Sequence, residues 1–298
     1  MRLKKGMRDV RPRLRIDIGA ILVAPLGIGI VLLAQMLAGI PASALLQYEA
    51  ALIVFGGTLG ALLVTYSPRD VLRTLRSAAG AFRIVRRDLD ALAATMMTLA
   101  TRAHRQGLVS IDDEADALAE PFLRDGLAFA IDEPSEEGLR EVLAAETAVR
   151  GENDESPARI LEAAAGYAPT LGILGAVLGL IHVMRTPGPP GSLGSGIAVA
   201  FIATVYGVGL ANLVLLPLAG RLRERAAFEA RRRELMTVGI CAIQQRTHPA
   251  ILARKLRTFG VKPERQRIAP AAPGASRLPS RPIGLEPLAN DANEPALA

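Results

Sequence analysis

Hydrophobic residues are concentrated in four blocks, and charged residues fill the stretches between them. The blocks run over 18–38, 50–66, 163–184 and 194–217, and none of them contains Asp, Glu, Lys or Arg. At about 1.5 Å of rise per residue, helices of this length cross the roughly 30 Å hydrocarbon core of a bilayer, the second block only narrowly. The pattern therefore predicts an all-α integral membrane protein with four transmembrane helices.

The positions of the basic residues indicate which helix ends face the cytoplasm. Arginines cluster after the second block, over 69–87, and after the fourth, over 221–233, and seven Lys or Arg precede the first block. The short hairpins at the opposite ends contain a single arginine between them. Because basic loops stay on the cytoplasmic side, we expect the clusters and both chain termini to be cytoplasmic.

The segments outside the blocks complete the predicted organisation. Residues 67–161 alternate charge with Ala and Leu at helical spacing, and the stretch after 261 holds seven of the twenty prolines. The predicted domains are a basic cytoplasmic N-terminus over 1–15, transmembrane helices one and two over 16–66, a cytoplasmic helical domain over 67–160, transmembrane helices three and four over 161–217, a cytoplasmic helix over 218–260, and a disordered Pro-rich tail over 261–298.

The charge distribution, the N-terminal pattern and the cysteine content each exclude or favour a class of protein. The net charge of +6 is compatible with nucleic-acid binding, but the basic residues flank the apolar blocks, so no nucleic-acid partner is expected. The N-terminus resembles a signal peptide, but its apolar run is too long, and we interpret it as a retained helix. Cys241 is the sole cysteine and is interpreted as a packing residue.

The sequence offers no catalytic constellation. No cluster of Asp, His or Cys has metal-ligand spacing, and neither a phosphate-binding loop nor a Ser-His-Asp arrangement is present. A membrane enzyme is therefore disfavoured, and no catalytic residue, metal or cofactor is expected. A secondary transporter acting alone is also disfavoured, because its substrate site needs polar groups near the midplane.

Small residues recur at the spacing that lets membrane helices pack closely. Such helices associate where Gly and Ala allow their backbones to approach. Gly56 and Gly60 form one G-x-x-x-G pair and Gly175 and Gly179 form another. The remaining small positions assigned to packing are Gly172 in helix three and a stripe of Ala203, Gly207 and Ala211 in helix four.

None of the four blocks supplies an ionisable carboxylate for an ion pathway. His182 lies near the outer end of helix three and is interpreted as a solvated interfacial residue. A partner must therefore supply the carboxylate if this protein helps to conduct ions. Thr204 and Ala176 should lie at similar depth, and Thr204 either lines a polar path or bonds to its own helix backbone.

Two prolines interrupt the apolar background. Pro169 removes the hydrogen bond to the Ala165 carbonyl and should kink or loosen helix three, whereas Pro217 is expected to end helix four at the cytoplasmic face. The residues alone leave open whether such a kink is a moving hinge or a fixed structural feature.

Several stretches of this chain resemble MotA stator subunits of the MotA/TolQ/ExbB proton channel family. The third and fourth helices of that family resemble AAAGYAPTLGILGAVLGLIHVM over 163–184 and LGSGIAVAFIATVYGVGLANLVLLPLAGRL over 193–222. Its second helix resembles IVFGGTLGALLVTYSP over 53–68, and its cytoplasmic domain resembles PFLRDGLAFAIDE over 121–133. The resemblance covers roughly residues 16–259.

The resemblance implies a flagellar function in the bacterial inner membrane. Several such multi-pass subunits are expected to form a homo-oligomeric ring around two copies of a MotB-type partner, whose single transmembrane Asp carries the ion. Protonation of that Asp is expected to move the ring, so that its cytoplasmic domains push on the rotor protein FliG and produce torque.

Individual residues match the motifs of this family. Pro169 and Pro217 match prolines linked to the movement, and Thr204 matches a threonine near the ion site. Ala176 stands where sodium-driven relatives tend to have Thr, which favours H⁺ over Na⁺ as the coupling ion. The rotor-facing stretch TRAHRQGLVSIDDEAD implies a set of charged contacts comprising Arg102, His104, Arg105, Asp112 and Glu114.

Within that set, Asp112 matches the acid of the family, and the position of its arginine falls on His104, between Arg102 and Arg105. An alternative interpretation of these charges is a solvated helix face.

A second departure from the family pattern follows helix one, where many relatives have Glu-Gly-Gly and this chain has LAGIP. The nearest alternative function is a TolQ or ExbB type subunit energising envelope processes, but those subunits have three membrane spans, and four are predicted here.

Overall fold

The structure is a computed structural model, and it describes residues 45–261 apart from 82, 87–88, 134 and 186–189, together with 13–16 and, with gaps, 26–39. The elements in chain order, with η marking 3-10 or π-helical turns, are β1 (Arg13–Ile16), α2 (Tyr48–Ala51), η2 (Leu52–Gly56), α3 (Gly57–Thr65), α4 (Pro68–Ala79), β2 (Arg83–Arg86), α5 (Leu89–Gln106), η3 (Leu108–Ile111), α6 (Asp112–Asp116), α7 (Pro121–Asp132), α8 (Glu136–Arg185), α9 (Pro190–Gly209), η4 (Leu210–Leu215), α10 (Leu216–Gln244) and α11 (Pro249–Arg257).

Three helical stretches of the described chain are long and apolar enough to cross a membrane. They are Tyr48–Thr65, Glu136–Arg185 and Ala200–Gln244, and they overlap the second, third and fourth apolar blocks. The first predicted helix, over 18–38, lies for the most part outside the described residues. The predicted tail over 261–298 lies outside them from its second residue onward.

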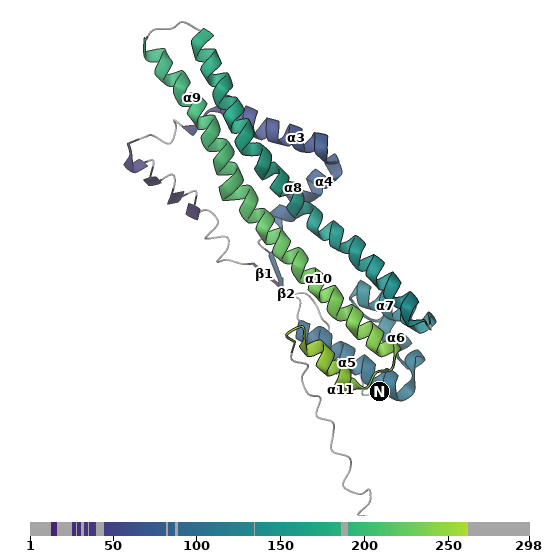
Figure 1. Cartoon of the computed structure of the whole chain (residues 1–298). Helices are drawn as coiled ribbons and strands as arrows, with labels where there is room; N and C mark the ends of the chain where they lie inside the picture. Colours follow the sequence, from purple (N-terminus) through teal and green to yellow (C-terminus); the bar gives the residue numbers. More distant parts are fainter. Residues whose placement is uncertain are drawn as a thin grey trace, which may run out of the picture. The chain divides into compact units, whose positions relative to one another are not determined.

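Two very long helical stretches carry the bilayer region and the charged region together. Helix α8 runs without a break from Glu136 to Arg185, so the expected boundary near residue 160 falls inside one helix. Helix α9, η4 and α10 likewise follow one another without a gap from Pro190 to Gln244. Figure 1 shows α8 lying beside α9 and α10, with the two stretches running in opposite directions.

Pro217 does not end helix four, contrary to the sequence-based expectation. It lies in the first turn of α10, directly after the π-helical turn η4. A proline ring clashes with the carbonyl four residues earlier in a regular α-helix, and the wider π turn relieves that clash. The helix therefore continues through the proline into the charged segment.

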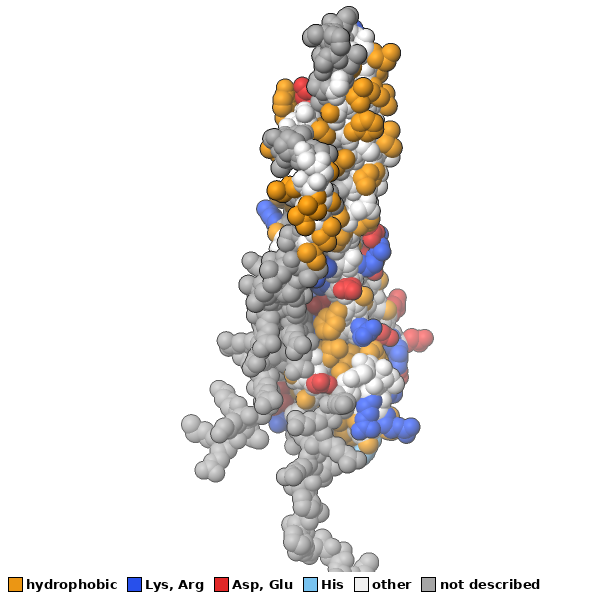
Figure 2. Space-filling view, turned by 90° about the vertical axis from the view of Figure 1, so that its left-hand side faces the viewer, with side chains coloured by type: hydrophobic (Ala, Val, Ile, Leu, Met, Phe, Trp, Pro, Cys, Tyr) orange, Lys and Arg blue, Asp and Glu red, His pale blue; other side chains and the backbone are white. Residues whose placement is uncertain are grey.

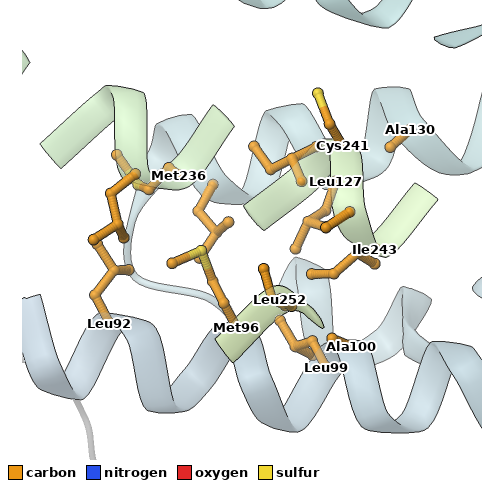
Figure 3. Close-up of a cluster of buried hydrophobic side chains, with 14 of the residues drawn as sticks. Leu92, Met96, Leu99, Ala100, Leu127, Ala130, Met236, Cys241, Ile243 and Leu252 are labelled. Atoms are coloured by element: carbon orange, nitrogen blue, oxygen red, sulfur yellow. The ribbon is translucent and has the colours of Figure 1, made fainter. Parts of the chain in front are cut away.

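The charged end of the chain has its own hydrophobic core, built mainly from the four helices α5, α7, α10 and α11, together with Leu139 and Leu143 of α8. Figure 3 shows side chains from these four helices pointing toward one another. The labelled members are Leu92, Met96, Leu99 and Ala100 of α5, Leu127 and Ala130 of α7, Met236, Cys241 and Ile243 of α10, and Leu252 of α11. The helix predicted over 218–260 is thus a structural part of this domain, because the end of α10 and α11 both bury apolar side chains in this core.

A short two-stranded ladder departs from the predicted all-helical fold. β1 pairs antiparallel with β2, with Arg13 opposite Arg86 and Ile16 opposite Arg83. The sequences RLRI and RIVR contain the β-branched residues Ile and Val, which favour strands. Apart from this ladder, the regular elements of the described chain are helical.

We predict that Leu127→Ala destabilises the charged domain by about 2–5 kcal/mol, because a fully buried side chain is replaced by a cavity. Cys241 is the only cysteine of the chain and is 5% exposed in the same core, so its rate of reaction with a maleimide reports opening of the core. Labelling of Cys241 should be faster in Leu127→Ala than in the parent chain.

Val109→Ala is the matched control, since Val109 is 78% exposed and its truncation should change the labelling rate by less than about twofold. Equal labelling rates for Leu127→Ala and Val109→Ala would show that this cluster is not the core of the domain.

Candidate functional site

The backbones of α8 and α9 lie in direct contact at two glycines. A Cβ atom added to Gly207 would lie 2.4 Å from the Ala168 carbonyl oxygen, and one added to Gly172 would lie 2.8 Å from the Ala203 carbonyl oxygen. Both distances are too short for any side chain, and the atoms in the way belong to the backbone. The two helices can therefore approach this closely only because both positions are glycine.

The same contact continues along α8 toward the hairpin. A Cβ atom at Gly175 would lie 2.9 Å from the Ala203 Cβ atom, and one at Gly179 would lie 3.3 Å from the Ala200 Cα atom. Four of the six glycines assigned to packing thus lie on the α8–α9 contact.

The remaining two glycines, Gly56 and Gly60, face no other helix among the described residues. A Cβ atom at Gly56 would meet only Leu52 of the preceding turn, and one at Gly60 would meet nothing within 4 Å. The neighbouring Gly57 faces α8 instead, where a Cβ atom would lie 3.0 Å from the Leu171 side chain. Consecutive glycines point to different faces of a helix, and spacing alone does not identify the face that packs.

Thr204 and Ala176 are both half-buried beside this contact. The Thr204 Cα atom would lie 3.2 Å from a Cβ atom at Gly172, and Gly175, next to Ala176, meets Ala203. This register places Thr204 opposite Gly172, about one helical turn along α8 from Ala176.

Both helices depart from regular α-helical geometry at the same level. Pro169 lies within α8 and cannot donate a hydrogen bond to the Ala165 carbonyl. Ala165 and Ala168 pack against Ala211, which belongs to the π-helical turn η4 of the facing stretch. The sequence predicted the irregularity at the proline but carries no comparable signal for the π turn.

Tyr206 connects α9 to the segment that precedes α2. Its hydroxyl donates a hydrogen bond to the Leu45 carbonyl oxygen and accepts one from the Gln47 backbone N–H at 3.2 Å. Its ring also lies 6.1 Å from that of Phe55, measured between centroids. Sequence analysis missed this residue, although a tyrosine within an apolar block normally has a polar partner.

Exposed apolar side chains cover the helices around this contact. Figure 2 shows them gathered toward one end of the molecule, while charged side chains occupy the other. The exposed set on α8 and α9 includes Ile173, Val177, Ile181, Phe201, Val205 and Val208. Within the described residues, no group of three or more His, Cys, Asp or Glu could hold a metal ion.

The charged residues predicted to face the rotor fall into two groups. Arg102 forms an ion pair with Glu114, and the Nδ1 atom of His104 lies 2.7 Å from the Arg246 carbonyl oxygen. Arg105 and Asp112 are exposed, and neither forms an ion pair within the described part of the chain. Arg105 and Asp112 are therefore the members of the set available to an outside partner.

These features define a helical membrane protein in which two helices pack through glycines within apolar blocks that lack acidic and basic residues, and continue into a charged domain. The sequence profile of the MotA/TolQ/ExbB proton channel family matches residues 114–235. An uncharacterized protein of Bacillus subtilis, YtxD, is 32% identical over 215 residues, which are 72% of this chain and 79% of that protein. The chain belongs to the MotA/TolQ/ExbB proton channel family.

The chain is also similar to proteins that carry a motility name. Motility protein A of Bacillus subtilis is 28% identical over 240 residues, covering 79% of this chain and 87% of that protein. The structure of the flagellar MotAB stator complex from Bacillus subtilis matches with a TM-score of 0.72 at 27% identity, covering 81% of this chain and 94% of that chain. The C. jejuni MotAB structure shares the fold with a TM-score of 0.74 at 22% identity, covering 86% of this chain and all of that chain.

Two glycines of α9 provide a matched test of the helix contact. Gly207→Ala should lower the free energy of unfolding by about 1–3 kcal/mol, because the new Cβ atom would overlap the Ala168 carbonyl. Gly209→Ala places its Cβ atom in open space and should be neutral or stabilising by up to about 1 kcal/mol, since alanine favours the helix. Denaturant unfolding of the full chain in detergent measures both effects, and stabilisation by both variants would contradict the backbone contact.

Proposed function

We propose that this chain is the ring-forming membrane subunit of a bacterial flagellar stator, which with a MotB-type partner conducts ions and generates torque. The observation that carries the proposal is the α8–α9 pair, whose glycine contact lies in an apolar region and whose helices continue into a charged domain. Relatives named motility protein A and a matching stator complex support the same function.

The proposed topology has four membrane spans, with both termini in the cytoplasm of the cell and the protein in the inner membrane. Three candidate spans lie in the described chain, and the first apolar block over 18–38 supplies the fourth. The basic clusters over 69–87 and 221–233 support this orientation. We retain the domain order proposed from sequence and propose that the 67–160 and 218–260 segments belong to one folded unit, because α5, α7, α10 and α11 share a core.

The partner is proposed to supply the membrane carboxylate that the apolar blocks of this chain lack. Its protonation changes a charge beside the apolar pair, and such a change shifts the balance between two packed arrangements. Pro169 and the π turn before Pro217 lack regular hydrogen bonding and face each other beside the glycine contact, so we assign the bending to them. Thr204 and Ala176 are proposed to border the ion site, with H⁺ as the coupling ion.

A deletion experiment tests the stator function. Loss of this gene should abolish flagellar motility, and motility should return only when the gene is expressed with a partner whose membrane Asp is intact. A protonophore should stop the restored motility, whereas replacing Na⁺ in the medium should not. Normal motility together with a defect in envelope transport would contradict the stator function and favour a TolQ or ExbB type role.

The exposed pair Arg105 and Asp112 is proposed to contact the rotor protein FliG. Exposed ion pairs contribute about 0–1 kcal/mol each, which corresponds to at most about a fivefold change in contact population. Asp112→Lys and Arg105→Glu should each reduce swimming speed while leaving the amount of assembled complex unchanged.

Glu141→Lys is the control for these reversals, because Glu141 is equally exposed on α8 and forms no ion pair among the described residues. It should leave swimming speed unchanged. Normal speed in the Asp112→Lys Arg105→Glu double variant would remove these two residues from the rotor contact.

A further inference from the structure

A polar cavity of about 430 Å³ lies between α4, α7, α8 and α10, on the charged side of the apolar blocks. Five arginines line it: Arg73 from α4, Arg150 from α8, and Arg225, Arg232 and Arg233 from α10. Neither the ion pathway nor the proposed rotor contact uses this cavity. Its lining brings together basic residues from three segments that are far apart in the sequence.

The carboxylates that line the cavity form ion pairs with two of these arginines. Arg232, whose side chain is 5% exposed, pairs with Glu120 and with Glu229. The Nη1 atom of Arg233 donates to an Asp154 carboxylate oxygen at 2.7 Å. The lining as a whole holds five arginines and three acids, so its net charge is positive.

Arg73 and Arg225 contribute to this positive charge from the exposed part of the cavity lining. Both side chains are exposed, and neither forms an ion pair within the described part of the chain. Arg150 pairs with Glu146 at 2.6 Å and lies over the Phe122 ring, which holds its guanidinium at the cavity wall. Two unpaired guanidinium groups facing one cavity attract an anion.

Arg233 provides an independent indication that a ligand belongs here. Its side chain is 8% exposed, and its Nε and Nη2 atoms are buried without a hydrogen-bond partner. Buried charged donors are rarely left unsatisfied, because their desolvation is not offset. An anion in the cavity would supply the missing acceptor oxygens.

We propose that this cavity binds a phosphate group. Arginine presents a planar fork of N–H donors that matches the oxygens of a phosphate, and clusters of arginine bind phosphate more strongly than single basic residues do. The inference requires only that the apolar helices cross a membrane, and it is independent of stator activity.

The place of the cavity in the chain favours the headgroup of an anionic phospholipid as the source of that phosphate. Pro157 in its wall precedes the third apolar block by six residues, about 9 Å of helix. Helix α4 follows the candidate span Tyr48–Thr65 and exposes Leu72 and Leu75 beside its arginines. An amphipathic basic helix in this position lies at the membrane surface, within reach of lipid phosphates.

The test compares two double variants in the full chain purified with its partner in detergent. Arg73→Gln Arg225→Gln removes the two exposed arginines of the cavity. Arg76→Gln Arg231→Gln removes the same charge from the same two helices at exposed positions outside the cavity. All four positions are exposed, so both variants should fold, which substitution of the buried Arg233 would not ensure.

Binding is measured by native mass spectrometry and by the shift in unfolding temperature with dioleoylphosphatidylglycerol, dioleoylphosphatidylcholine or inorganic pyrophosphate. We expect phosphatidylglycerol to bind the parent chain and the Arg76→Gln Arg231→Gln control alike. Binding to Arg73→Gln Arg225→Gln should be at least about tenfold weaker, as loss of charge-assisted hydrogen bonds predicts.

The other probes identify the source of the phosphate. Pyrophosphate binding with the same dependence on Arg73 and Arg225 would support the phosphate site and assign it to a soluble ligand instead of a lipid. Equal binding by the two double variants, equal binding of phosphatidylcholine and phosphatidylglycerol, or no binding of any probe would overturn the proposal.

Discussion

The direct backbone contact between α8 and α9 is the constraint on which the rest of the structure depends. Lipid gives little hydrophobic force between helices, so their association rests on close packing. Gly172 and Gly207 allow that packing and also fix its register, since each faces a backbone carbonyl of the other helix. The register in turn sets the depth of Thr204 beside Gly172 and brings Ala168 against the π turn.

Both partners of this contact are long helical stretches, so a shift at the contact also moves the parts of these helices that lie beyond the bilayer region. Helix α8 is continuous for 50 residues, and α10 enters the core of the charged domain through Met236, Ile240 and Ile243. A shift at the glycine contact therefore reaches that core along continuous helices. The helices lack regular hydrogen bonding at Pro169 and at η4, which lie opposite each other, so bending concentrates there.

The sequence predicted the three apolar helices of the described chain and the charged domain, because hydrophobic blocks and helical periodicity depend on local composition. Features that depend on tertiary contacts were not predicted from the sequence. The choice of Gly57 over Gly56 as the packing residue depends on how α3 is rotated against Leu171. The tyrosine bond from Tyr206 to Leu45 joins positions 161 residues apart. The π turn before Pro217 relieves a clash that spacing does not reveal.

The arginines of the chain divide between two physical environments, and the division follows their proposed roles. Arg232 and Arg233 are buried on α10 and paired with acids of α8, of α10 and of the residue before α7, so removing one partner would leave an uncompensated buried charge. Such pairs hold the charged domain in one arrangement. Arg105 is exposed, where water and salt screen its charge and any single contact is weak. A domain that must engage and release a moving partner needs both: a rigid interior that transmits force, and surface charges whose contacts break easily.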